Sequence, residues 1–191
     1  MSVSTPSWLG SRCTKRGERL EPAELAMPEL HPAEILAVLT KHDVRYVVIG
    51  GLAAILHGAP HLTTDVDIVP EEGRANLDRL SAALTELNAR IRIPGDENGV
   101  PFGHDGESLA RVRVWNLVTD LGNLDITFVP SGTRGYDDLR RDVGTMKVRG
   151  IDVPVASLAD VIRSKEAADR ERDRAILPVL REMLERERRG R

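Results

Sequence analysis

The chain has 191 residues, of which 41% are hydrophobic and 30% are charged, a composition typical of one globular domain with at most a short extension. Its single cysteine excludes an internal disulfide and a thiolate metal cluster, and no apolar run approaches the roughly 18 residues that a membrane span needs. The N-terminus lacks a continuous apolar core like that of a signal peptide, so we expect a cytoplasmic protein without membrane contact.

Residues 1–28 mix Ser, Pro, Gly and charged residues without periodicity, which predicts a poorly ordered arm ahead of a core over residues 29–156. The sequence pattern at the start of this core predicts two helices that alternate with two strands, of which the first is buried and the second has one apolar and one acidic face. In chain order these elements are a helix over 31–44, a strand over 45–50, a helix over 51–58 and a strand over 63–70. Gly58 should end the second helix and Pro70 the second strand.

The middle of the chain predicts one more helix and several strands. Leucines at helical spacing over residues 71–89 indicate an amphipathic helix that covers one face of the sheet. Residues 99–108 are typical of a polar, Gly-rich loop. Two β-rich runs at 110–119 and 123–129, joined by Asp-Leu-Gly, predict a hairpin, and residues 147–155 predict one more short strand.

Residues 157–191 are helical in pattern and should pack on the core. Ser157, with Asp160 three residues later, is close to a capping box, and Pro178 predicts a break that divides the segment into two helices. The expected fold class is therefore α+β, with a small mixed β-sheet, flanking helices and a C-terminal helical segment.

Two carboxylates stand out in the strand over residues 63–70. Residues two apart in a strand share a face, so Asp65 and Asp67 lie side by side, with Cα atoms roughly 6 to 7 Å apart. They repel each other unless a positive charge lies between them, and oxygen-only ligands are those that Mg²⁺ takes. The alternative is a solvated edge strand, or pairing with nearby arginines.

Glycines and a third acid accompany this pair. Gly50 and Gly51 fall where a strand ends and a helix begins, and the exposed amides of such a turn can bind an anion. Asp125 lies in an otherwise apolar β-run, and if that run neighbours the first acidic strand, the three carboxylates could hold two metal ions. The alternative is that Asp125 satisfies turn amides near Gly122 and Asn123.

These motifs resemble those of the DNA polymerase β-like nucleotidyltransferase superfamily: VVIGG is followed by DVDI and by a third Asp in a hairpin strand. Within it, YVVIGGLAAILHGAPHLTTDVDIVP together with SKEAADRERD is similar to the AbiEii and MenT group of nucleotidyltransferase toxins from bacterial toxin–antitoxin systems. The resemblance covers about residues 32–180 and implies the nucleotidyltransferase fold.

The resemblance also implies an activity. An NTP would donate a nucleoside monophosphate, expected to be a pyrimidine nucleotide, to the 3′ acceptor end of tRNA, which blocks aminoacylation and translation. The cofactor would be Mg²⁺ or Mn²⁺, and a cognate antitoxin would be a partner. The implied residues are Asp65, Asp67 and Asp125 for the metals, with Asp125 as metal ligand or base, Lys165 as a catalytic residue that reaches the triphosphate, and Gly50, Gly51, Thr64 and Asp173 for the nucleotide.

Some of these residues could instead have a purely structural role. Thr63 matches a position where related toxins carry a regulatory phosphorylation, and a phosphate there should abolish NTP binding, although β-propensity alone also accounts for a threonine. Lys165 could instead pair with Asp169 on an exposed helix face, and Asp173 could cap the last helix. Leu52 departs from the superfamily, because many relatives have a serine there that contacts phosphate.

Other functions stay open at this point. The same chemistry could modify a protein hydroxyl or a small molecule, or the chain could be a nucleotide-binding or antitoxin-binding module without turnover. Arg111 and Arg113 alternate near the expected site, where they could hold an RNA phosphate or neutralise the carboxylates, and we favour the second.

Overall fold

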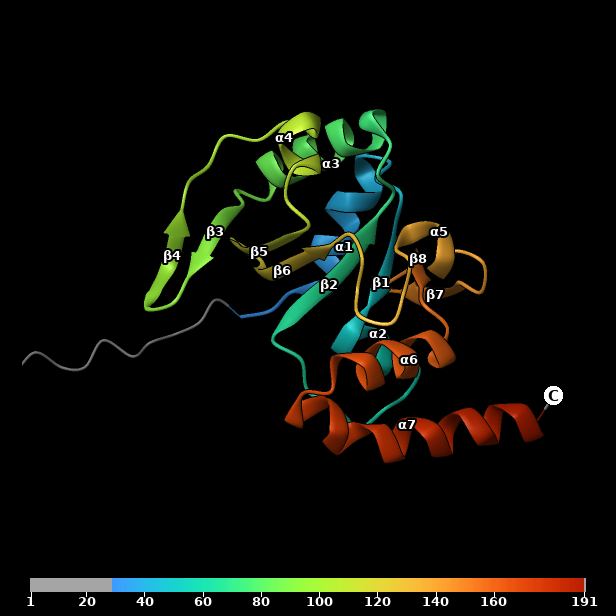
Figure 1. Ribbon diagram of the computed structural model, residues 1–191. Helices are drawn as coiled ribbons and strands as arrows, with labels where there is room; N and C mark the ends of the chain where they lie inside the picture. The colour runs from blue at the N-terminus through green and yellow to red at the C-terminus, as the bar shows by residue number, and fades with distance from the viewer. Residues whose placement is uncertain (1–28, 191) are drawn as a thin grey trace, which may run out of the picture.

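The computed structural model describes residues 29–190, so the arm predicted for residues 1–28 lies outside them (Figure 1). The described residues form one eight-stranded mixed sheet with strand order β4-β3-β5-β6-β2-β1-β8-β7. The strands are β1 (Tyr46–Ile49), β2 (Asp65–Pro70), β3 (Arg90–Ile93), β4 (Asp96–Val100), β5 (Val114–Thr119), β6 (Gly122–Thr127), β7 (Gly144–Val148) and β8 (Ile151–Val155).

Helices flank this sheet, which confirms the predicted α+β class. They are α1 (Pro32–Lys41), α2 (Gly50–Leu56), α3 (Arg74–Glu86), α4 (Gly106–Ala110), α5 (Tyr136–Leu139), α6 (Leu158–Ala168) and α7 (Glu171–Arg189). Helix α1 packs against α3, whereas α6 packs against both α2 and α7, and these last three lie together at one end of the sheet (Figure 1). No helix of the described residues is both long and apolar enough to cross a membrane.

The central strands make the core. All four residues of β1 are buried, and β2 alternates as predicted, with Val66 and Ile68 fully buried and Asp65 and Asp67 only partly so. Branched aliphatic side chains dominate the core, and Phe128 is its largest fully buried member. Each such side chain contributes roughly 1.5–3 kcal/mol by leaving water, so the apolar face of β2 fixes which face carries the acids.

Two regions contain more structure than the sequence predicts. The single strand expected over residues 147–155 is a hairpin of β7 and β8, which turns at Arg149 and Gly150, both with positive φ. The expected loop over residues 99–108 includes the end of β4 and the start of α4, and the β3–β4 hairpin before it was not predicted.

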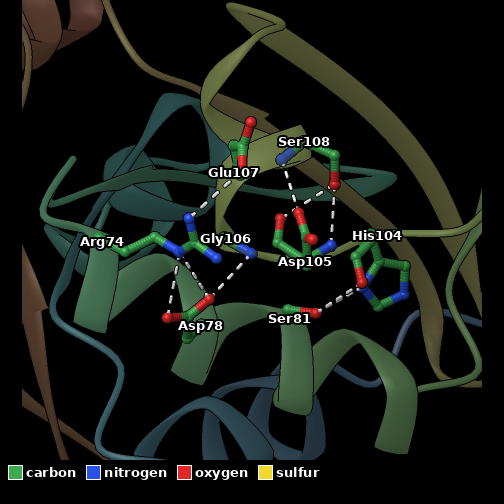
Figure 2. A network of polar contacts seen from close by, with 8 residues as sticks. All are labelled: Arg74, Asp78, Ser81, His104, Asp105, Gly106, Glu107 and Ser108. Carbon is green, nitrogen blue, oxygen red and sulfur yellow. Dashed lines mark hydrogen bonds and ion pairs between the residues drawn. The ribbon is translucent and has the colours of Figure 1, made fainter.

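A network of polar contacts holds residues 104–108 in a defined conformation (Figure 2). The Ser81 hydroxyl lies 2.8 Å from His104 Nδ1, and the Gly106 amide donates to Asp78 Oδ1. Asp105 and Ser108 then form a reciprocal capping box that opens α4. The segment is therefore held to α3 by hydrogen bonds that the composition of a polar loop does not reveal.

The break between the last two helices was predicted at the wrong residue. It falls at Asp169, which takes a left-handed conformation with φ of 48°, while Pro178 lies inside α7. Arg174 Nη1 donates to the Asp169 carbonyl (3.0 Å) and carboxylate (3.1 Å), which stabilises the turn. Leu177 and Leu180 beside the proline are buried, and their packing offsets the roughly 3 kcal/mol that an interior proline costs.

Candidate active site

The sheet topology brings the three acids to one place. Strands β2 and β6 are parallel neighbours, and Asp67 lies directly opposite Asp125 in their register. Asp65 lies two residues before Asp67 on β2 and therefore on the same face of the sheet. On the other side of β2, Ile49 lies opposite Asp67, so the chain leaves β1 and enters α2 at Gly50 beside this carboxylate. The neighbouring strands on which a shared acidic site depends are therefore present.

A cleft of about 540 Å³ opens over these residues. Its floor comes from the ends of the central strands, and one wall comes from the end of α6 and the start of α7. The residues that the sequence proposed for the metal, the nucleotide and regulation all line it: Gly50, Gly51, Thr63, Thr64, Asp65, Asp67, Asp125, Lys165 and Asp173. Asn116, Arg170 and Arg172 line it as well and were not anticipated.

Close packing around Gly50 and Gly51 leaves no room for a side chain at either position. Gly50 has φ of +71°, and a Cβ at this position would overlap the Asp67 carboxylate. A Cβ on Gly51 would lie 2.6 Å from Thr63 Oγ1. The bare backbone therefore approaches the acids closely, and the Gly51 amide donates a hydrogen bond to Asp67.

The acids form a strongly negative cluster. Burial, followed by the charges of Asp65 and Asp125, raises the pKa of Asp67 to about 7, while the Gly51 amide and Lys165 oppose the increase. Thr63 Oγ1 donates to Asp65 Oδ1 at 2.9 Å. The ion pairs found among residues 29–190 include none with Asp65 or Asp67, so no basic side chain contacts either carboxylate directly.

Asp125 has a partner that the sequence reasoning missed. Arg92 Nη2 on β3 donates to both carboxylate oxygens, at 2.8 and 2.9 Å, and this contact opposes the burial that raises the pKa of Asp125. The alternation of charged and apolar residues in RIRI, residues 90–93, is the signal that could have indicated this strand.

The role predicted for Arg111 and Arg113 is wrong. Arg111 pairs with Glu107 on its own short helix, and Arg113 forms two hydrogen bonds of 2.8 and 2.9 Å with Glu72. Both arginines are exposed, and the ion pairs that they form within residues 29–190 are with these glutamates and not with the carboxylates of the cleft. Neutralisation of the site therefore comes from another strand.

Lys165 and Asp173 form a buried ion pair across the two last helices. Lys165 Nζ lies 2.8 Å from Asp173 Oδ1, and the two side chains are only 12% and 6% exposed. Lys165 does not use Asp169, which pairs with Arg174, and no side chain caps the start of α7. The exposed helix pair and the helix cap that the sequence allowed are therefore both wrong, and the lysine is held at the cleft by a charge from the next helix.

The donor set suits a hard divalent cation. Three carboxylates supply only oxygen ligands beside a cleft that can admit phosphates, which is the environment that Mg²⁺ prefers. In the arrangement that residues 29–190 adopt, no three His, Cys, Asp or Glu side chains surround one point closely enough to bind an ion. Asp125 in this arrangement is directed at Arg92.

Comparison with known proteins identifies the fold. No family model matches the chain, and no curated protein matches it. The crystal structure of the lincosamide antibiotic adenylyltransferase LnuA, bound to lincomycin, matches with a TM-score of 0.56 and 16% identity, over 81% of this chain and 99% of that one. This chain therefore has the nucleotidyltransferase fold.

Two further solved structures are less similar. A Thermotoga maritima protein provisionally described as a nucleotidyltransferase matches with a TM-score of 0.45 and 20% identity, over 83% of this chain and 97% of that one. The antibiotic-resistance factor ANT(2'')-Ia matches with a TM-score of 0.43 and 12% identity, over 83% and 95%.

Proposed function

We propose that this protein is a metal-dependent nucleotidyltransferase that moves a nucleoside monophosphate from an NTP to an acceptor hydroxyl. The observation that carries the proposal is the register of β2 and β6, which sets Asp67 opposite Asp125, next to Asp65 and a glycine turn that excludes side chains. Two carboxylates without an ion pair, beside the backbone of a glycine turn, fit a cation and a triphosphate better than either alone.

The residues divide into three roles. The amides of Gly50 and Gly51, with Thr64, would hold phosphate oxygens, and Lys165, oriented by Asp173, would add a positive charge from the α6 side. When bound, Mg²⁺ or Mn²⁺ at the carboxylates would stabilise the negative charge that develops on the triphosphate.

Besides helping to hold the metal, Asp125 would act on the acceptor. It would take the proton of the attacking hydroxyl, whose oxygen forms a bond to the α-phosphorus while the bond from that phosphorus to the β-phosphate bridging oxygen breaks. Pyrophosphate then leaves with the electron pair of that bond. Because Asp125 is partly buried with a raised pKa, it is a better proton acceptor than an ordinary surface aspartate.

The acceptor proposed first is the 3′ end of tRNA, which makes the protein a translation-blocking toxin with a cognate antitoxin. The resemblance of the glycine and acid motifs, and of the segment around Lys165, to the AbiEii and MenT toxins supports this acceptor and a pyrimidine NTP. Arg170 and Arg172 at the cleft wall could contact RNA phosphates. Thr63, 2.9 Å from Asp65 Oδ1, is the proposed site of regulatory phosphorylation.

A small-molecule acceptor is the second candidate, and the rim of the cleft favours it. Leu62 is 91% exposed there, and Val114 and Val129 are each close to half exposed, so an acceptor with an apolar face would cover them. A solved structure with the same fold is that of a lincosamide adenylyltransferase.

Each α-³²P-labelled NTP, supplied with Mn²⁺, tests the proposal. The acceptors are total RNA, a lincosamide and a protein extract, and the variants are Asp67→Asn and, as a matched control, Asp142→Asn, which changes an exposed carboxylate outside the cleft. We expect one NTP to label tRNA, the label to be lost in Asp67→Asn, and the control to behave as wild type. Label in the lincosamide or protein pool would move the acceptor to that class. No transfer to any pool would leave only a binding module and overturn the proposal.

A further inference from the structure

A row of polar side chains crosses four strands of the sheet, and three of its members lie on the floor of the cleft. Asp67 on β2 lies opposite Asp125 on β6, and Asp125 lies opposite Asn116 on β5. Ile91 of β3 lies opposite Leu117 of β5, so the antiparallel register, continued by one residue, brings Arg92 opposite Asn116. Arg92 therefore reaches across one intervening strand to contact the third carboxylate.

The contact uses the whole carboxylate of Asp125. A single nitrogen, Arg92 Nη2, lies 2.8 Å from Oδ1 and 2.9 Å from Oδ2, so neither oxygen is left to face another cation undisturbed. The Arg92 side chain is 28% exposed and that of Asp125 is 15% exposed, so water screens the pair only in part.

We propose that Arg92 is a positioning residue that serves as the internal counter-ion of Asp125 and releases it when the metal and nucleotide enter together. The inference rests on the proposed function, because it assumes that Asp125 ligates the metal. Without metal, Arg92 relieves the repulsion among the three acids and keeps Asp125 aligned. A bare divalent ion must compete with this guanidinium, whereas an ion that arrives with a triphosphate brings further contacts that favour the exchange.

The consequence is measurable without turnover. Removal of the Arg92 charge takes away both a competitor for Asp125 and a repulsive neighbour of the metal, so the affinity for a bare divalent ion should rise. Arg90 gives a matched control, since it lies on the same strand but pairs with Asp120, in the turn between β5 and β6. Its replacement changes the net charge by the same amount at a different place.

The experiment measures binding of Mn²⁺ alone to the full chain, by electron paramagnetic resonance of the free ion. We expect Arg92→Gln to bind Mn²⁺ about tenfold more tightly than wild type, which corresponds to about 1.4 kcal/mol. Arg92→Lys, which keeps a cation, should stay near wild type, and so should Arg90→Gln. Far-UV circular dichroism of each variant verifies that it is folded.

The outcomes separate the two claims. If wild type binds Mn²⁺ and Asp67→Asn does not, but Arg92→Gln has wild-type or weaker affinity, the role of Arg92 is refuted while the metal site remains. If Arg90→Gln raised the affinity for Mn²⁺ by the same factor, the role of Arg92 would also be refuted, because net charge alone would then account for the effect. If Asp67→Asn binds Mn²⁺ as wild type does, the carboxylate site itself is wrong, and both claims are overturned.

Discussion

The negative charge of Asp67 should destabilise the metal-free protein, and its removal in Asp67→Asn should increase stability. Burial, with help from Asp65 and Asp125, raises the pKa of Asp67 from 3.8 to about 7. A raised carboxyl pKa means that the fold favours the protonated form. The protonated carboxyl group of Asp67 therefore contributes its full stabilisation of the fold below pH 3.8, and this contribution is lost as the pH rises through about 7.

The size of the effect follows from the two pKa values of Asp67. Each unit of difference between the folded and unfolded pKa values corresponds to about 1.4 kcal/mol, so the ionised carboxylate costs about 4 kcal/mol near pH 8 and about 2 kcal/mol near pH 5. The first figure is an upper bound, because the asparagine amide accepts a weaker hydrogen bond from Gly51 than a carboxylate does. We expect the advantage of Asp67→Asn over wild type to grow by about 2 kcal/mol between these two pH values.

Urea unfolding in EDTA, followed by far-UV circular dichroism at several pH values, measures this advantage. Asp142→Asn removes an exposed carboxylate and should show no comparable growth with pH. A constant difference between Asp67→Asn and wild type across the range, or a less stable variant near pH 8, would refute the reasoning. Either result would mean that the acids are already compensated within the fold.

Other substitutions test the remaining parts of the cleft. Gly50→Ala should abolish nucleotide transfer and destabilise the fold by more than about 1 kcal/mol. Gly58 also has a positive φ, but a Cβ there would meet open space, so Gly58→Ala should reduce stability and leave transfer unchanged. Equal transfer activities of these two variants would contradict the steric argument. Lys165→Ala should cost about 3 kcal/mol in chemical denaturation, because the buried Asp173 then keeps only the longer 3.7 Å ion pair with Arg170. Adding Asp173→Asn should recover most of that loss, and independent, additive effects of the two substitutions would count against the pair. Thr63→Glu should weaken NTP binding in a filter assay at least tenfold while Thr63→Val binds nearly as wild type, and similar affinities would argue against phosphorylation control.

Local pattern in the sequence was enough to predict the strands that carry the three acids. The period of two in DVDIV separates the acids from Val66 and Ile68, and the structure has that separation. The turn at Asp120 and Leu121 joins the hairpin strands as expected, which brings Asp125 into a strand rather than a loop. These features depend on neighbours within a few residues, so a single sequence contains the information.

The electrostatic partners could not be predicted in the same way. Whether Asp125 pairs with Arg92, Arg111 or Arg113 depends on the order of strands β3, β5 and β6, and that order is set by contacts distant in sequence. The β3 strand is only four residues long and half charged, so its pattern alone does not distinguish a strand from a polar loop.

The position of the helix break illustrates a second limit. A proline inside a helix removes one hydrogen bond, and sequence rules therefore place the break at Pro178. The structure breaks at Asp169 instead, where the chain must turn so that Asp173 can reach Lys165 while Leu177 and Leu180 remain buried. Tertiary packing outweighed the local preference, and only the assembled fold shows this.

The cleft is assembled from distant parts of the polypeptide: its acidic floor lies on β2 and β6, but its lysine wall lies on α6, held by α7. A ribosome releases the floor long before it releases the wall. A nascent chain that ends before residue 158 therefore has the acids without their opposing lysine. If the proposed function holds, transfer at this cleft begins only after the two last helices have emerged and docked, so the order of synthesis itself keeps the unfinished protein inactive.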